Sequence, residues 1–265
     1  MLYVHENNLK NKINSNYNGL KSEILDFYEK EYLPMRNYIF SLVFSLEHKE
    51  NFKKATDVFN EYYNKLLDFS RKYGVKSQSK FESTFLEEIS VYLVKDIDEI
   101  SSNKLGVFNK KIYAGLKIDG KHKIEIITKD VDFCVGKRVE IAIDNQPKTE
   151  LILPVIAVEV KTYLDATMFG EVKSSSKSIK SASPNSKTYV LMGYKCIADE
   201  HIIAARQDSV LNEIFVLREN DHLPMDAKVI YNYWEELFLS IKTLATEKEI
   251  VVPGRLLNPE KNSGL

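Results

Sequence analysis

The sequence predicts an α/β (α+β) fold in which helices flank a mixed central β-sheet, with a separate helical lobe at the N-terminus. Three observations predict this class. Apolar residues recur every three or four positions through residues 20–73, which is the period of amphipathic helices. The period falls to about two over residues 110–161, as expected for strands. Helix-like and strand-like segments then alternate as far as residue 248.

The helical segments have recognisable limits. In the N-terminal lobe, residues 1–75, Gly74 is a suitable end for the last helix. The segment that follows predicts a helix with Ser77 or Ser79 as its N-cap. Later helices are expected at about 165–182 and at 229–248.

The strands are predicted from short stretches with alternating apolar residues, separated by Asp-Gly and Asp-Asn-Gln-Pro turns. They lie at 112–118, 123–135, 138–144, 149–161, 188–194 and 213–219. Together with the later helices they define a core over residues 76–250. Residues 251–265 contain Pro and Gly and are expected to form a flexible tail.

Composition narrows the class of protein. The 265 residues include 37 basic and 38 acidic side chains, an ordinary globular balance. Two cysteines form no disulfide framework, and no apolar run is long enough to cross a membrane. No glycine-rich phosphate loop is present, so no nucleotide cofactor is expected. We expect a cytoplasmic protein without a membrane partner.

The stretch VIAVEVKTYLD, residues 155–165, places two charges in an apolar strand. Alternation sends Ala157, Glu159 and Lys161 to one face and the neighbouring Ile and Val side chains to the other. Charges there are costly without partners. The upstream strand offers Asp132, which would lie beside Glu159 if the two strands pair, and Asp130 is an alternative two residues away.

Two carboxylates and a lysine at a strand end have a clear chemical use. Mg²⁺ takes hard oxygen ligands and needs only one or two protein carboxylates besides water and phosphate. Asp132 and Glu159 would bind the metal, with the main-chain carbonyl of Val160 as a further ligand. Lys161 would orient or activate a water. The arrangement suits the hydrolysis of a phosphodiester.

Asp132 followed by Glu159-Val160-Lys161 resembles the D…(D/E)xK core of the PD-(D/E)XK nuclease superfamily, to which many type II restriction endonucleases belong. The resemblance covers roughly residues 80–220, and Val131 stands where the family usually has proline. It implies a restriction-endonuclease-like core and Mg²⁺-dependent cleavage of double-stranded DNA at a specific sequence, by a metal-bound water that leaves a 5′-phosphate and a 3′-hydroxyl. Because palindromic targets match two-fold symmetric proteins, it also implies a homodimer.

The family often adds a glutamate from the helix before the strands. In KFESTFLEEISVYL, helix geometry places Glu82 near the middle of the apolar face, Glu88 at its margin and Glu87 on the opposite side. A glutamate within an apolar face is costly unless a partner or a functional role compensates for its burial. We therefore predict Glu82 as the accessory metal ligand, with Glu88 as the alternative.

Residues that contact DNA are predicted after the motif. Lys173, Lys177 and Lys180 recur at helical spacing among serines and are expected to bind backbone phosphates. Arg206 and Gln207 follow, and their side chains are suited to reading base edges.

Three other readings remain open. A repair or mobile-element nuclease of the same superfamily would share the site without sequence-specific cutting. A catalytically inactive DNA-binding module would keep the lysines and lose metal dependence. An interaction protein would use the aromatic helices for docking, with Glu159 and Lys161 as a surface pair.

Overall fold

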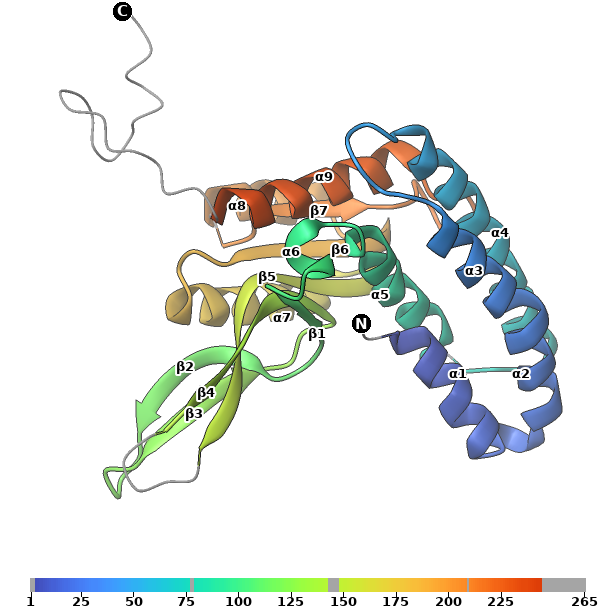
Figure 1. Ribbon diagram of the computed structural model, residues 1–265. Coiled ribbons are helices and arrows are strands. Elements are labelled where there is room, and N and C mark those ends of the chain that lie inside the picture. The colour runs from blue at the N-terminus through green and yellow to red at the C-terminus, as the bar shows by residue number, and fades with distance from the viewer. Residues whose placement is uncertain (1–2, 77–78, 143–147, 209, 245–265) are drawn as a thin grey trace, which may run out of the picture.

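A five-stranded mixed sheet forms the centre of the molecule (Figure 1). The computed structural model describes residues 3–76, 79–142, 148–208 and 210–244. The strand order is β1-β4-β5-β6-β7. β1 pairs antiparallel with β4 and β4 with β5, whereas β5, β6 and β7 run parallel. The bounds of the strands are Gly106–Phe108 (β1), Phe133–Ile141 (β4), Thr149–Leu164 (β5), Lys187–Lys195 (β6) and Glu213–Val216 (β7).

Helices cover both faces of this sheet. One face packs on α5 (Phe81–Val94) and α9 (Ala227–Leu244), and the other on α7 (Ala166–Ala182) and α8 (Asp199–Asp208). The alternation predicted for β5 is confirmed. Ile156, Val158 and Val160 lie in the core with α5 and α9, whereas Ala157 packs with Ile179 of α7 on the opposite face. The buried thiol of Cys134 belongs to this second cluster.

The N-terminal helices form an arch beside the sheet (Figure 1). They comprise α1 (Val4–Asn14), the short η1 (Tyr17–Gly19), α2 (Lys21–Phe27), the π-helical η2 (Tyr28–Tyr32), α3 (Leu33–Ser41) and α4 (Glu50–Lys72). Their apolar side chains, such as Leu9 and Phe59, belong to the same hydrophobic core as Phe133 and Val158 of the sheet. The lobe predicted for residues 1–75 is therefore helical, and its core is continuous with that of the sheet.

A β-arm projects away from the core (Figure 1). It combines the hairpin β2 (Ile112–Ile118) and β3 (Ile124–Lys129) with the distal parts of β4 and β5. Leu116 and Ile118 near its end are 53% and 70% exposed. The arm is anchored at its base, where Ile112 packs against Val131 and Cys134.

Several elements differ from the expectations. The N-cap of α5 is Lys80, in a left-handed conformation, and not Ser79, while Ser77 lies outside the described residues. The single strand expected at 123–135 is divided into β3 and β4 by a turn at Asp130 and Asp132. The short elements α6 (Asp98–Ser101) and β1, as well as α1 and α8, were not predicted. The tail 251–265 lies outside the described residues.

None of the helices in the described part of the chain is long and apolar enough to cross a membrane.

Candidate active site

The antiparallel register of β4 and β5 brings Asp132 to the two charged residues of β5. Phe133 pairs with Val158, so Asp132, one residue earlier, lies next to Glu159. Its carboxylate accepts a hydrogen bond from the main-chain N–H of Val160 at 2.8 Å. The main chain of β5 thus holds the Asp132 carboxylate in place at the start of β4.

Lys161 joins the two carboxylates. Its ammonium lies 3.1 Å from Glu159 Oε2 and 3.5 Å from Asp132 Oδ2. The side chains of Glu159, Lys161 and Asp132 are 15%, 26% and 29% exposed, so the group is partly covered but open to a ligand. Both carboxylates converge on one cation.

α7 supplies a further contact from the same face of the sheet. Ser175 donates a hydrogen bond to Glu159 Oε1 at 3.4 Å. The helix begins directly after β5, where Asp165 is its N-cap and accepts from the N–H of Met168 at 2.8 Å. This short connection places Ser175 beside Glu159.

The electrostatics of the group favour a charged lysine. Burial raises the pKa of Glu159, Lys161 opposes that rise, and Asp132 adds to it. For Lys161, burial acts to lower the pKa, but Asp132 and Glu159 outweigh it and the net pKa is raised. At neutral pH Lys161 is therefore an ammonium, a donor of hydrogen bonds and of charge and not a ready proton acceptor.

Glu87 of α5 lines the same cavity as Asp132, although helical periodicity predicts it on the side opposite the apolar face. Burial and the negative charge of Asp132 raise the pKa of Glu87 to about 8, partly offset by Lys80, Lys161 and Lys110. Almost every residue of α5 is buried, because the N-terminal helices cover one side and the sheet the other. In a helix covered on both sides, the residue opposite the apolar stripe still points into the protein.

Glu82, the predicted accessory ligand, is engaged elsewhere. It accepts a hydrogen bond from the hydroxyl of Tyr63 in α4 at 3.2 Å. The same hydroxyl accepts from Arg218 Nη2 at 3.2 Å, and Arg218 is buried, with its guanidinium over the Tyr63 ring. The contacts of Glu82 thus connect α5 to the N-terminal lobe and not to Asp132.

Glu88, the alternative, anchors α1. Its Oε2 accepts from the main-chain N–H groups of His5 and Glu6 in the first turn of α1, at 2.8 and 3.1 Å. Its Oε1 accepts from the hydroxyls of Tyr32 and Tyr92 at 2.7 and 2.6 Å. The carboxylate is fully buried and fully occupied. Its role is to cap another helix across the core.

Asp130 is separated from the group. Its Oδ1 accepts from the main-chain N–H of Lys111 at 3.1 Å, in the exposed turn before β4. Of the two aspartates left open by the sequence, Asp132 is the one that reaches Glu159 and Lys161.

The sequence model of the family described as "Bpu10I restriction endonuclease" matches residues 78–239, which include Glu87, Asp132, Glu159 and Lys161. The chain belongs to the Bpu10I restriction endonuclease family. No curated protein matches the sequence.

A solved structure supports the fold of this endonuclease. The structure described as "native BbvCI A2B2 tetramer at low resolution" matches with a TM-score of 0.74 at 15% sequence identity. The match covers 92% of this chain and 98% of the other, so it extends into the N-terminal helices beyond the family match. It confirms the mixed sheet flanked by helices.

The lysines of α7 lie on the other flank of the helix from the carboxylates. At about 100° per residue, Lys173, Lys177 and Lys180 are displaced by roughly 140–200° from Ser175, which contacts Glu159. Lys177 is exposed. Contact of these lysines with DNA stays a prediction, and it would occur away from the carboxylates. Arg206 and Gln207 lie in α8, and their side chains are outside the described part of the structure.

The donor set fits a hard divalent cation with an incomplete protein shell. Among the described residues, no three His, Cys, Asp or Glu side chains come together as a metal site. Asp132 and Glu159 converge on the Lys161 ammonium, which shows that their oxygens can share one cation. Two carboxylates with water and phosphate completing the shell are typical of Mg²⁺.

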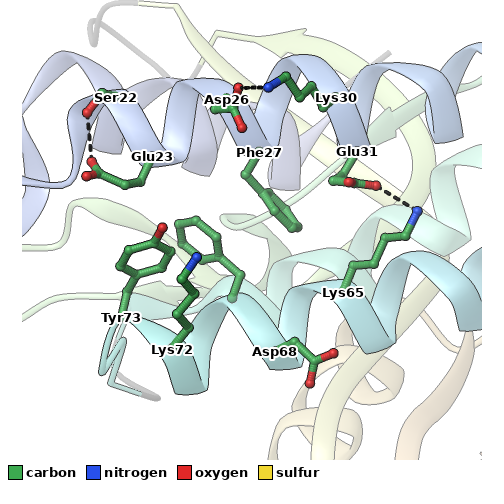
Figure 2. Close-up of a pocket in the computed structure, with 11 residues that line it drawn as sticks. Ser22, Glu23, Asp26, Phe27, Lys30, Glu31, Lys65, Asp68, Lys72 and Tyr73 are labelled. Atoms are coloured by element: carbon green, nitrogen blue, oxygen red, sulfur yellow. Dashed lines mark hydrogen bonds and ion pairs between the residues drawn. The ribbon is translucent and has the colours of Figure 1, made fainter.

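A cavity lies away from this group in the endonuclease, between α2, η2 and α4 (Figure 2). It measures about 620 Å³. Figure 2 shows Lys30 paired with Asp26 and Lys65 paired with Glu31, the second pair at 2.8 Å. None of the residues that line it belongs to the group around Asp132.

Proposed function

We propose that the protein is a Mg²⁺-dependent endonuclease that hydrolyses phosphodiester bonds of double-stranded DNA at a specific sequence and leaves 5′-phosphates. The observation that carries the proposal is the convergence of Asp132, just before β4, with Glu159 and Lys161 of β5. The Lys161 ammonium lies within 3.5 Å of both carboxylates. Membership of a restriction endonuclease family supports DNA as the substrate.

Each residue of the group has a role that its surroundings support. Asp132 and Glu159 would hold Mg²⁺, with the carbonyl of Val160 as a further oxygen ligand. When bound, Mg²⁺ supplies charge neutralisation at the scissile phosphate and lowers the pKa of water. Ser175 holds the Glu159 carboxylate in orientation. Lys161, charged at neutral pH, donates hydrogen bonds to the attacking water or to a phosphate oxygen.

We assign the role of accessory acid to Glu87, whereas the sequence alone predicts Glu82. Glu87 faces Asp132 and Lys161, whereas Glu82 faces Tyr63. With its pKa raised to about 8, Glu87 holds a proton at neutral pH and releases it when positive charge enters the group. It would then assist the metal through its water shell.

Digestion of a plasmid of known sequence tests the function. We expect discrete bands with Mg²⁺ and none with EDTA, and mapping of the ends gives the target and the 5′-phosphates. Cleavage without a defined set of fragments would favour a repair or mobile-element nuclease. A salt-sensitive gel shift without cleavage would favour an inactive DNA-binding module.

The assembly that cuts both strands is a second part of the proposal. Two-fold symmetric targets favour a homodimer. The structurally similar BbvCI is described as an A2B2 tetramer, which favours instead an assembly containing a second kind of subunit. Measurement of the mass in solution, together with the ratio of nicked to linear plasmid produced by the purified chain, distinguishes them. If the purified chain only nicks the plasmid, a second kind of subunit is required to cut the other strand.

A further inference from the structure

A polar cavity of about 370 Å³ opens beside Asp132 and Glu87, which both line it. This volume is within the range of about 300–1,000 Å³ that is usual for ligand sites. Three separate parts of the chain form the other walls: α1, the start of α5 and the loop between β1 and β2. Their polar residues include Asn7, Asn8, Asn11, Lys80, Asn109 and Lys110.

Lys80 and Lys110 bring positive charge to the cavity, which Asp132 and Glu87 also line. Both lysines are exposed, and neither forms an ion pair within the described residues. The main-chain N–H of Lys110 donates to the carbonyl of Val131 at 2.8 Å, which fixes this lysine next to Asp132. Both ammonium groups act on the Glu87 carboxyl, lowering its pKa. An anionic group of a ligand that enters the cavity would meet the ammonium groups of Lys80 and Lys110.

The same two lysines have left-handed backbones. Their φ angles are +60° and +59°, a region that favours glycine. Non-glycine residues held in this region concentrate at functional sites, where the surroundings enforce the strain. Here both strained positions carry an ammonium group to one cavity.

The α1 wall supplies neutral hydrogen-bonding groups. Asn8 donates from Nδ2 to the carbonyl of Ser79 at 3.2 Å, which orients its amide. Its Oδ1 is buried and has no hydrogen-bond partner, which is unusual for a buried acceptor. Asn7 and Asn11 are exposed on the same helix and line the same cavity. The wall therefore offers the two exposed carboxamides of Asn7 and Asn11 to a ligand.

We propose that this cavity receives the segment of the DNA strand next to the scissile phosphate. Lys80 and Lys110 bind its phosphates, and Asn7 and Asn11 hydrogen-bond to its polar edges. The proposal rests on the nuclease function above and makes α1, which lies outside the family match, part of the substrate site.

The salt dependence of DNA binding tests the role of the lysines. The probe is a mixed-sequence DNA duplex in EDTA, with affinity measured by fluorescence anisotropy over a series of salt concentrations. Each phosphate contact contributes about 0.9 to the slope of log K against log salt. The double variant Lys80→Gln/Lys110→Gln should lower the slope by about 1.8. Asn7→Ala/Asn11→Ala should weaken binding and leave the slope unchanged.

The matched control is Lys53→Gln, which removes an exposed lysine of α4 that is paired with Asp57 outside the cavity. It should leave the slope unchanged. If the glutamine variants fail to fold, Lys80→Gly and Lys110→Gly remove the charges and suit the positive φ. A wild-type slope in the double variant overturns the cavity proposal, and cleavage of plasmid by the wild-type protein would still support the nuclease. Absence of DNA binding and cleavage by the wild-type protein overturns both.

Discussion

At the scale of single residues, the balance of charge around Lys161 decides the chemistry. Two carboxylates and a partly buried lysine stabilise one another only as a set, because each alone would be an uncompensated charge at a covered position. Lys161 is charged before substrate arrives, so its contribution is expected to be electrostatic and orientational.

Replacement of Lys161 by alanine should abolish cleavage and leave DNA binding largely intact. Loss of the ammonium removes the donor to the water or phosphate, and a loss on the order of 100-fold or more in the rate of cleavage is expected. A single-turnover assay with a gel shift measures both quantities. Cleavage at the wild-type rate would contradict the role of Lys161.

Replacement of Glu87 by glutamine should change how stability depends on pH. The pKa of Glu87 rises from 4.5 to about 8 on folding, so the folded state binds its proton more tightly than the unfolded state. The contribution of Glu87 to the free energy of unfolding is complete below pH 4.5 and is lost as the pH rises to about 8. Over this range the free energy of unfolding falls by up to about 1.4 kcal/mol per pH unit. Glu87→Gln should remove this slope.

Urea unfolding of both proteins without metal, at several pH values from 4.5 to 8, measures the difference. Because glutamine resembles the protonated carboxyl, the difference reports the titration of Glu87 together with the charges coupled to it. A constant difference across this range would show that Glu87 is not held in its protonated form.

At the scale of elements, two helices show what the sequence can and cannot predict. The helix expected at 165–182 is observed at Ala166–Ala182, because Asp165 is a strong local cap and the apolar period follows at once. The start of α5 was not predicted, because Lys80 takes a left-handed conformation that no local signal indicates.

The position of Glu87 could not be predicted for a related reason. Helical periodicity identifies one apolar face and assumes that the other faces water. In α5 the second side packs on the rest of the fold, and only the arrangement of α1, the sheet and α5 shows this. The carboxylate pair was predictable, because the alternation of β5 and the pairing of neighbouring strands are local.

The cap that joins α5 to α1 gives a prediction for Glu88. Glu88→Leu would leave the N–H groups of His5 and Glu6 without their acceptor inside the core, each at a cost of about 1–3 kcal/mol. Urea unfolding should show this loss of stability. Glu61→Leu, which removes a glutamate that is 67% exposed on α4, is the control and should have little effect. Equal stability of the two variants would contradict the capping role.

At the scale of the whole molecule, the N-terminal helices and the nuclease sheet share one core. The division at residue 75 separates two kinds of secondary structure, but Phe85 and Tyr92 of α5 pack against Phe59 and Tyr62 across it. Such a boundary differs from the sparse, polar interface that is usual between independent domains.

Deletion of residues 1–75 should therefore prevent cooperative folding of the remainder. The buried side of α5 would be exposed, and the chain should aggregate. Thermal unfolding followed by circular dichroism, together with size-exclusion chromatography, measures this against the full chain. A soluble truncated protein with a sharp transition would show that the core domain is independent.

The buried thiol of Cys134 in β4 gives the molecule an internal reporter of the opening of this strand. Cys134 lies two residues after Asp132, fully buried among Ile112, Val131 and Ala157, and burial raises its pKa, whereas Cys196 is exposed. A thiol reagent should modify Cys196 at once and Cys134 only when β4 separates from its neighbours. The rate of the slow phase of labelling would thus measure how often the start of β4, next to Asp132, separates from its neighbours, in the same protein sample used for cleavage.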